Sequence, residues 1–308
     1  MSPDLIVLLT GLFAAGIRLA TPIALAALGE VVAQRSGVLN VGLEGILLVG
    51  AFLAVLFAVW SGSPWVGLLA AIVGGTLMGL IHAFFVVILR TDQIVTGIAL
   101  IFLGLGVSGY GFRLTLGAES GAVAVPGFQR LNIPGLSDLP VVGPILFSQH
   151  ALVYIAVAMA IAIAFVLTRT RAGLMIRAAG ENPHAAAALG VSVSRVRIAC
   201  VAFGGACAGM GGAFLSTAQL TGFVEDMAAG RGFIAIACVV FARWSPLGVL
   251  LVAGVFGVAD AAQIRLQPFF PNLPYQAFVV LPYVLAILAL IFASRSLRLP
   301  AALGKSDD

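Results

Sequence analysis

Charged side chains are scarce in this chain of 308 residues. They make up 9% of the sequence, whereas about a quarter of the residues in an ordinary soluble domain are charged. Hydrophobic residues make up 61%, and the mean hydropathy is +1.15. No water-soluble fold of this length could bury so much apolar surface. The sequence therefore predicts an all-α, polytopic bundle of transmembrane helices, with residues 1–308 forming a single domain.

The chain also lacks the common motifs of catalysis and metal binding. The tail Gly304-Lys305-Ser306 resembles the end of a Walker A sequence, but Leu299 stands where the leading glycine is required. There is no HExxH zinc motif and no Gly-x-Ser-x-Gly nucleophile elbow, and the three histidines and three cysteines have no metal-ligand spacing. We expect no catalytic residue, no metal and no cofactor on this chain, and therefore no enzyme activity of its own.

Lysine is almost absent: the sequence has one lysine, Lys305, and fifteen arginines. The net charge is +4, and many of the arginines flank apolar runs. This pattern is typical of membrane topology, because positive residues concentrate at the cytoplasmic ends of spans. It does not indicate a nucleic-acid partner.

Eight apolar runs are long enough to cross a bilayer. They cover residues 4–29, 41–60, 65–89, 94–113, 150–168, 197–219, 247–264 and 276–294. A ninth run, 231–243, is short, and it could cross while tilted, re-enter, or continue from earlier residues. We expect eight to ten spans, with the ninth run in the protein interior. Glycines and alanines at helical spacing, at Gly75 and Gly79 and densely between 204 and 212, predict close helix packing.

A basic loop, residues 169–197, sets the orientation and carries a short helix. It holds five arginines and one acid, Glu181, so the positive-inside rule places it in the cytoplasm together with the C-terminus. Asn182 can cap a helix, Pro183 suits the first turn, and Gly190 can end it. A helix of this length cannot cross a membrane. It predicts a docking surface for a cytoplasmic partner.

The Gly- and Pro-rich segment 114–148 then lies outside the membrane. Two interpretations stay open for it. It either receives an external partner or only connects two spans.

Polar side chains within spans are candidates for a transport pathway, because they are costly in lipid and usually face the bundle interior. Glu44 is the strongest candidate, and Asn40, four residues earlier, is expected to share its helix face. The alternative for this pair is a structural hydrogen bond that tethers the glycine-rich start of the helix. Arg18, in the first run, either snorkels or pairs with a buried acid. The further pathway candidates are Phe52, Thr96, Phe241 and Asp260.

Three segments carry a family resemblance. Residues 34–45 read QRSGVLNVGLEG, residues 173–190 read GLMIRAAGENPHAAAALG, and residues 229–237 read AGRGFIAIA. The sequences Arg243-Trp244-Ser245-Pro246-Leu247-Gly248 and Leu281-Pro282-Tyr283 follow the third segment. In this order the segments resemble the membrane subunits of bacterial ABC importers, in the branch for nucleosides and simple sugars. The first is similar to the signature ERSGVxNxGxEG of that branch, with Gln34 where the family often has Glu.

This resemblance implies a mechanism and a set of partners. The chain would form half of a pore with a second permease subunit, in a homologous heterodimer rather than a homodimer. Separate ATPase subunits, which carry ATP and Mg²⁺, would drive transport. An extracytoplasmic binding protein or lipoprotein would deliver a purine or pyrimidine nucleoside or, as the second choice, a simple sugar. The implied location is the lipid of the bacterial inner (plasma) membrane. The residues implied in ATPase coupling are Gly180, Glu181, Asn182, Pro183, His184, Ala185, Ala186 and Gly190.

A stand-alone secondary carrier for a small polar solute is the alternative. Such carriers typically show internal repeats and broken helices in both halves, with buried charges for ion coupling. No clear repeat is present and few charges fall within the apolar runs. A carrier would also leave the short cytoplasmic helix unexplained.

Overall fold

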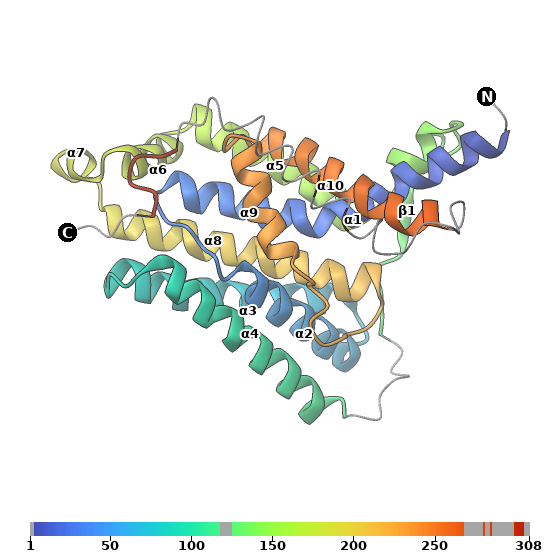
Figure 1. Ribbon diagram of the computed structural model, residues 1–308, viewed down its shortest axis with the longest axis horizontal. Helices are drawn as coiled ribbons and strands as arrows, with labels where there is room; N and C mark the ends of the chain where they lie inside the picture. Colours follow the sequence, from blue (N-terminus) through green and yellow to red (C-terminus); the bar gives the residue numbers. More distant parts are fainter. Residues whose placement is uncertain (1–2, 118–124, 268–279, 281–283, 285–298, 305–308) are drawn as a thin grey trace.

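The computed structural model describes residues 3–117, 125–267, 280, 284 and 299–304, and these form a bundle of long helices (Figure 1). The elements are α1 (Pro3–Arg35), α2 (Leu43–Ser61), α3 (Pro64–Ala83), the π-helical turn η1 (Phe84–Ile88), α4 (Gln93–Thr115), β1 (Arg130–Asn132), η2 (Gly143–Phe147), β2 (Ser148–His150), α5 (Ala151–Arg169), α6 (Arg171–Glu181), α7 (Pro183–Ala188), α8 (Val193–Phe214), η3 (Leu215–Gln219), α9 (Arg231–Phe241) and α10 (Pro246–Leu266). The prediction of an all-α membrane bundle is confirmed.

Seven helices in the described part of the chain are long and apolar enough to cross a membrane. They correspond to the first seven predicted runs, while the run at 276–294 lies, apart from residues 280 and 284, outside the described residues. The predicted end of the first run at residue 29 is wrong, because α1 continues to Arg35. Glu30 and Gln34 are fully buried in this extension, where each finds a polar partner. The short ninth run forms α9, which has 11 residues.

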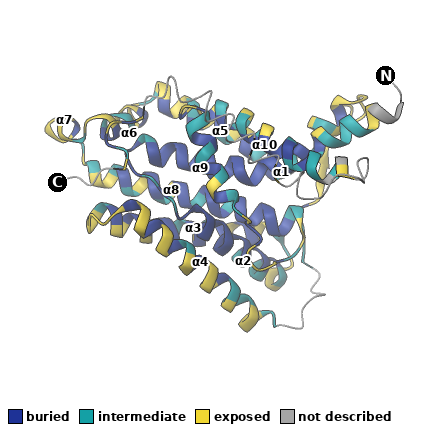
Figure 2. Ribbon diagram, viewed as in Figure 1, coloured by how far each residue is buried: buried dark blue, intermediate teal, exposed yellow. Residues whose placement is uncertain are grey.

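Helix α8 packs against α1, α2 and α3 in the interior of the bundle, and its glycines permit this close approach. A Cβ on Gly205 would collide with the carbonyl oxygen of Gly75, and one on Gly209 would collide with that of Ala71. Most of α8 is therefore buried, whereas one side of α4 is exposed along its length (Figure 2). The prediction of close packing through small residues is confirmed.

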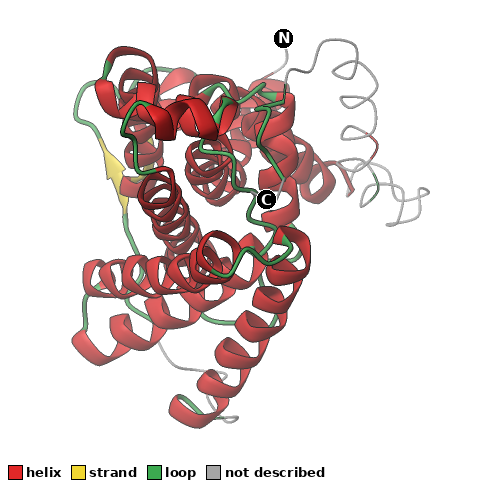
Figure 3. Ribbon diagram, turned by 90° about the vertical axis from the view of Figure 1, so that its left-hand side faces the viewer, coloured by secondary structure: helices red, strands yellow, loops and turns green. Residues whose placement is uncertain are grey.

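The two ends of the bundle differ in character. Helices α6 and α7 project from one end, and β1 lies toward the other (Figure 1). Residues 130–132 and 148–150 form a small antiparallel ribbon in which Arg130 pairs with His150. Seen from the end that carries α6 and α7, the strand lies to one side of the helices (Figure 3). The segment 114–148 thus contains a short strand and a π-helical turn as well as connecting loop.

Candidate functional site

Helix α7 has the caps that the sequence predicted. The side-chain oxygen of Asn182 accepts a hydrogen bond from the Ala185 amide at 3.0 Å, and Pro183 occupies the first turn. Gly190 has a φ of +84°, a left-handed conformation that glycine adopts without strain. Ala186 is buried against the protein, while the neighbouring side chains of α7 are mostly exposed, with Leu189 86% exposed just after its end. Such an apolar residue on a projecting turn is suited to docking.

Helix α6 precedes α7 and was missed by the sequence analysis. It begins after Thr170, whose hydroxyl accepts a hydrogen bond from the Gly173 amide at 3.2 Å. Its buried residues are Gly173, Ala179 and Gly180, which lie on the protein side. The threonine cap and these small residues were the local signal for the helix. The loop between the two spans is therefore a pair of helices, α6 and α7, joined at Asn182.

Residues 36–42 leave the helical conformation between α1 and α2, and buried side chains satisfy their backbone. The amide of Leu39 donates to the Gln93 side chain at 2.7 Å, and its carbonyl oxygen lies 3.2 Å from His82 Nε2. Arg197 Nε donates to the carbonyl of Ser36 at 3.2 Å. Irregular backbone at membrane depth requires such partners, because no water is present to replace them. The segment is thus a fixed break between two helices.

Glu44 holds the start of α9. Its Oε1 accepts a hydrogen bond from the Gly230 amide and its Oε2 accepts one from the Gly232 amide, both at 2.6 Å. The first amides of a helix have no partner within the helix, and a carboxylate is favourable beside them. Glu44 is 5% exposed, so these bonds are shielded from water. A carboxylate from α2 therefore caps a helix that begins 187 residues later in the chain.

The expected helix face shared by Asn40 and Glu44 is wrong. Asn40 lies before α2, and its side-chain oxygen accepts from the Gly42 amide at 3.0 Å. The backbone amide of Asn40 in turn donates to Glu30 Oε1 at 3.0 Å. A helix cannot extend back to residue 40 because these local bonds hold the backbone in another conformation.

The other end of α9 is tied to the end of α1. The indole nitrogen of Trp244 donates to the Gln34 side chain at 2.7 Å, and Gln34 donates to Glu30 at 2.9 Å. Arg35 donates to the Trp244 carbonyl at 3.3 Å. The segment from Glu30 to Glu44 therefore holds α9 at both its ends.

The same segment touches the pair α6–α7. A Cβ on Gly180, in the last turn of α6, would collide with the carbonyl oxygen of Arg35, so the two backbones are in direct contact. Near the C-terminus, the Ala302 amide donates to the Gly180 carbonyl at 2.9 Å. A displacement of α6 would thus reach the 30–44 segment directly, and α9 through it.

The remaining pathway candidates fall into different places. Phe52 packs edge-on against Phe223, which lies in the loop that leads to α9, and the two ring centroids are 6.0 Å apart. Glu44 lies at the start of α9, and Asp260 lies in α10, which packs against α1 and α9.

Two candidates lie away from the start of α9. Thr96 donates to the Asp92 carbonyl at 2.7 Å in the first turn of α4. Phe241 ends α9 and stacks on Phe256 of α10, with centroids 6.3 Å apart. Contact of any of the six candidates with substrate stays a prediction.

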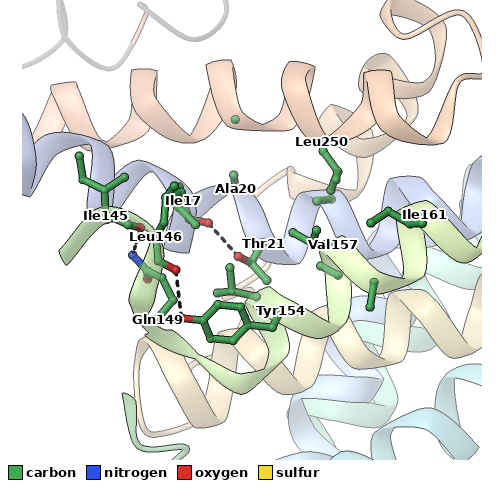
Figure 4. Close-up of a pocket in the computed structure, with 15 residues that line it drawn as sticks. Ile17, Ala20, Thr21, Ile145, Leu146, Gln149, Tyr154, Val157, Ile161 and Leu250 are labelled. Carbon is green, nitrogen blue, oxygen red and sulfur yellow. Dashed lines mark hydrogen bonds between the residues drawn. The ribbon is translucent and has the colours of Figure 1, made fainter. Parts of the chain in front are cut away.

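A cavity of 490 Å³ opens between α1, α5 and α10 (Figure 4). Its walls are almost entirely apolar, with Ile17, Val157 and Leu250 among them. Few polar groups lie at its edge: Gln149 donates to the Ile145 carbonyl at 2.7 Å and Tyr154 donates to that of Leu146 at 3.0 Å, which leaves Gln149 Oε1 as a single acceptor without a partner in the described structure. A polar solute needs converging polar groups, so this cavity does not suit one.

Comparison with known proteins connects this architecture to transport. A family model described as "Branched-chain amino acid transport system / permease component" matches residues 12–291. The guanosine ABC transporter permease NupQ of Bacillus subtilis is 39% identical over 93% of this chain and 93% of its own length. The nucleoside ABC transporter permease NupC of Lactococcus lactis is 36% identical over 88% of each chain.

A sugar permease is similar to the same degree. TsgC13 of Haloferax volcanii, provisionally named a glucose ABC transporter permease, is 36% identical over 86% of this chain and 81% of its own length. Each of the three organisms also has a second matching permease, and these three (NupP, NupB and TsgB13) are 26%, 27% and 30% identical to this chain.

Proposed function

The chain belongs to the branched-chain amino acid transport system / permease component family, and from this premise we propose that it forms half of the pore of an ABC importer for nucleosides. It is a multi-pass membrane permease subunit of an ABC transporter. Relatives named for guanosine and for nucleosides, at 39% and 36% identity, support the choice of substrate. A simple sugar is the second candidate, supported by the relative named for glucose at 36% identity.

The pair α6–α7 is the proposed docking element for the ATPase. The capped helix α7 presents exposed residues and the apolar Leu189 at its end, and Gly180 of α6 lies against Arg35. Closure of the ATPases on ATP would push α7 and α6. The push would pass through Arg35 to the 30–44 segment, and from Gln34 and Glu44 to the two ends of α9. Movement of α9 would then alternate access between the two sides.

A second, related permease is the proposed partner within the membrane. Three organisms each have two permeases that match this chain. The sequence identity of this chain is higher to NupQ, NupC and TsgC13 than to NupP, NupB and TsgB13. The consistent difference supports two specialised positions in the pore, one of which this chain fills. An extracytoplasmic binding protein would deliver solute at the end of the bundle opposite α7.

The proposed orientation follows from charge. The loop at residues 169–197, which contains α6 and α7, holds five arginines and one acid. Ala302, near the C-terminus, lies at the same end of the bundle, because its amide donates to the Gly180 carbonyl of α6. The positive-inside rule therefore supports a cytoplasmic position for this end.

The test is reconstitution of the complex, with its second permease and ATPase subunits, in proteoliposomes. We expect ATP-dependent uptake of labelled guanosine, with unlabelled glucose as the competing sugar. Replacing Glu181, Asn182 and Pro183 together by alanine should remove the cap and first turn of α7, so that ATP hydrolysis continues while uptake is lost. Alanine at Leu251 and Val255, two exposed residues of α10, is the control. Normal uptake in the triple variant would refute the coupling role of α7, and uptake without ATP would favour a secondary carrier.

A further inference from the structure

Three arginines from three separate elements line one cavity at the end of the bundle opposite α7. Arg18 comes from α1, Arg130 from β1 and Arg265 from the last turn of α10, and the cavity has a volume of 290 Å³. The Arg265 side chain lies across Gly11 of α1, where a Cβ would collide with its guanidinium group. The three positive charges are therefore brought together by the tertiary structure, since they are far apart in the sequence.

The described part of the chain provides no acid to neutralise these arginines. None of the cavity's lining residues is acidic, and the ion pair found at this end of the bundle joins two other residues, Arg113 and Glu225. Of the segments outside the described ranges, residues 268–298 contain no Asp or Glu in their sequence, whereas residues 118–124 contain Glu119. Of the two expectations for Arg18, pairing with a buried acid is therefore not met among the described residues.

Three guanidinium groups that line one cavity repel one another, and the repulsion is only partly screened because Arg18 and Arg265 are half-buried while Arg130 is exposed. His150 also lines the cavity and is 7% exposed, with its Nδ1 2.9 Å from the Phe128 carbonyl oxygen. Burial lowers the pKa of His150, the contact with Phe128 raises it, and the charges of Arg130 and Arg18 add a smaller lowering. An anion in the cavity would relieve this repulsion.

The donors around the cavity are arranged for a ligand with oxygens in several directions. Guanidinium groups form paired, charge-assisted hydrogen bonds to carboxylates and phosphates. A carboxylate offers two oxygens in one plane, whereas the donors here approach from α1, β1 and α10. Gln219 adds an amide at the cavity, whose Oε1 is buried without a partner in the described structure, and rotation of that amide would present its NH₂ group as a donor.

The depth of the cavity favours the same ligand. Arg18 lies near the middle of α1, seventeen residues before Arg35 at the end of that helix, which is about 25 Å along the helix axis. The hydrocarbon core of a bilayer is about 30 Å thick, so Arg18 can reach the level of the phosphates of the far leaflet by extending its side chain. Soluble anions reach this level from the aqueous side, and lipid headgroups lie in it.

We propose that this arginine cavity binds a phosphate group, carried either by a soluble anion or by the headgroup of a phospholipid in the leaflet opposite α7. The site is separate from transport of the proposed solute, because a nucleoside or glucose has no charge that three arginines would recognise. The ligand holds α1, α10 and the β1–β2 ribbon together by bridging residues from each.

The experiment uses the assembled transporter, delipidated in dodecyl maltoside, a detergent without phosphate. Inorganic phosphate is titrated at constant ionic strength by calorimetry, and bound phosphatidylglycerol is measured separately by native mass spectrometry after it has been added to the micelles. The test variant is Arg130→Gln with Arg265→Gln. The matched control is Arg113→Gln, which removes an arginine at the same end that already has an acidic partner.

We expect the double variant to weaken binding of phosphate or phosphatidylglycerol by about tenfold or more, because charge-assisted hydrogen bonds are lost, while the control binds as the parent does. Tight binding of inorganic phosphate would identify a soluble source, and retention of phosphatidylglycerol alone would identify the lipid. Arg130→Gln alone, on an exposed strand, serves if the double variant does not assemble.

Equal binding in the test variant and the control would overturn the proposal. The proposal would also be overturned if the double variant lost binding to an extracytoplasmic protein while both phosphate measurements stayed unchanged. The arginines would then bind a carboxylate of that protein. Guanosine uptake by the parent complex is measured independently, so failure of the phosphate site and failure of the proposed transport function remain distinguishable.

Discussion

At the scale of single residues, the position of α9 depends on the carboxylate of Glu44. Two backbone amides, at Gly230 and Gly232, each donate to a different oxygen of this side chain. A carboxylate is the group that can accept at both positions without presenting a donor. Any neutral replacement leaves an amide without a partner in a buried site.

Replacing Glu44 by Gln should therefore destabilise the protein although the shape is nearly unchanged. The glutamine NH₂ would face one of the two amides, and an unsatisfied buried donor costs about 1–3 kcal/mol. Thermal unfolding of the detergent-solubilised complex would measure the loss, and transport should fall with it. Glu225→Gln is the control, since its carboxylate makes an exposed pair that contributes little. Equal unfolding temperatures for the two variants would contradict this role of Glu44.

The pair between Arg113 and Glu225 predicts a small pH dependence at the end of the bundle opposite α7. The hydrogen bonds from Arg113, at 2.7 and 2.9 Å, lower the pKa of Glu225 below its ordinary value. A lowered folded-state pKa contributes stability above the unfolded pKa, and this contribution is lost as the pH falls through the folded pKa. Because the pair is exposed, the effect is small.

The measurement is the unfolding temperature of the parent and of Arg113→Gln between neutral pH and pH 4. The difference between the two proteins should shrink as the pH falls, and salt should shrink it at every pH. A difference that grows toward low pH would contradict the assignment.

The residues that matter at this scale were partly predictable. Glu44 stands out in the sequence because an acid in an apolar run is rare. Its partners do not, because Gly230 and Gly232 lie more than 180 residues away and contribute only backbone amides. The arginine cavity escaped notice for a similar reason, since Arg18, Arg130 and Arg265 meet only in the folded chain.

At the scale of elements, local signals predicted α7 correctly and tertiary contacts decided the rest. The cap at Asn182 and the glycine at 190 act within their own turns, so they could be recognised in the sequence. The end of α1 could not be recognised in the sequence. Glu30 and Gln34 can be buried in this helix because they accept hydrogen bonds from Asn40 and Trp244, which lie outside it. The break at residues 36–42 likewise depends on side chains from α3, α4 and α8.

The contact between α3 and α8 gives a prediction for this scale. Gly205→Ala places a methyl group against the Gly75 carbonyl, and overpacking of this kind costs about 1–3 kcal/mol. Thermal unfolding and the yield of assembled complex would both fall. Gly106→Ala is the matched control, because a Cβ there meets no atom and alanine favours the helix of α4. Similar losses in both variants would show that α8 can move away from α3 at little cost.

At the scale of the whole molecule, the chain forms one connected route from α6 and α7 to the bundle interior. Gly180 touches Arg35, the segment after it leads to Glu44, and Glu44 and Gln34 hold the two ends of α9. The helical class was predicted from composition and is confirmed, while the cytoplasmic side of the short helix, inferred from charge, stays a prediction. The sequence could not predict this route, because each step joins elements that are distant in the chain.

The last prediction concerns the number of copies of this chain in the pore. Three organisms each have two matching permeases, and in every case one is distinctly more similar to this chain than the other. Two positions that had remained interchangeable would not show such a consistent difference. We therefore expect one copy of this chain beside one copy of the second permease.

Native mass spectrometry of the complex, with the two permeases carrying tags of different mass, would count the copies. A complex with one of each and two ATPase domains agrees with the prediction, and this chain expressed without the second permease should give no ATP-dependent uptake. Two copies of this chain in an active complex would contradict it. In that case a single substitution at Glu44 would alter both halves of the pore.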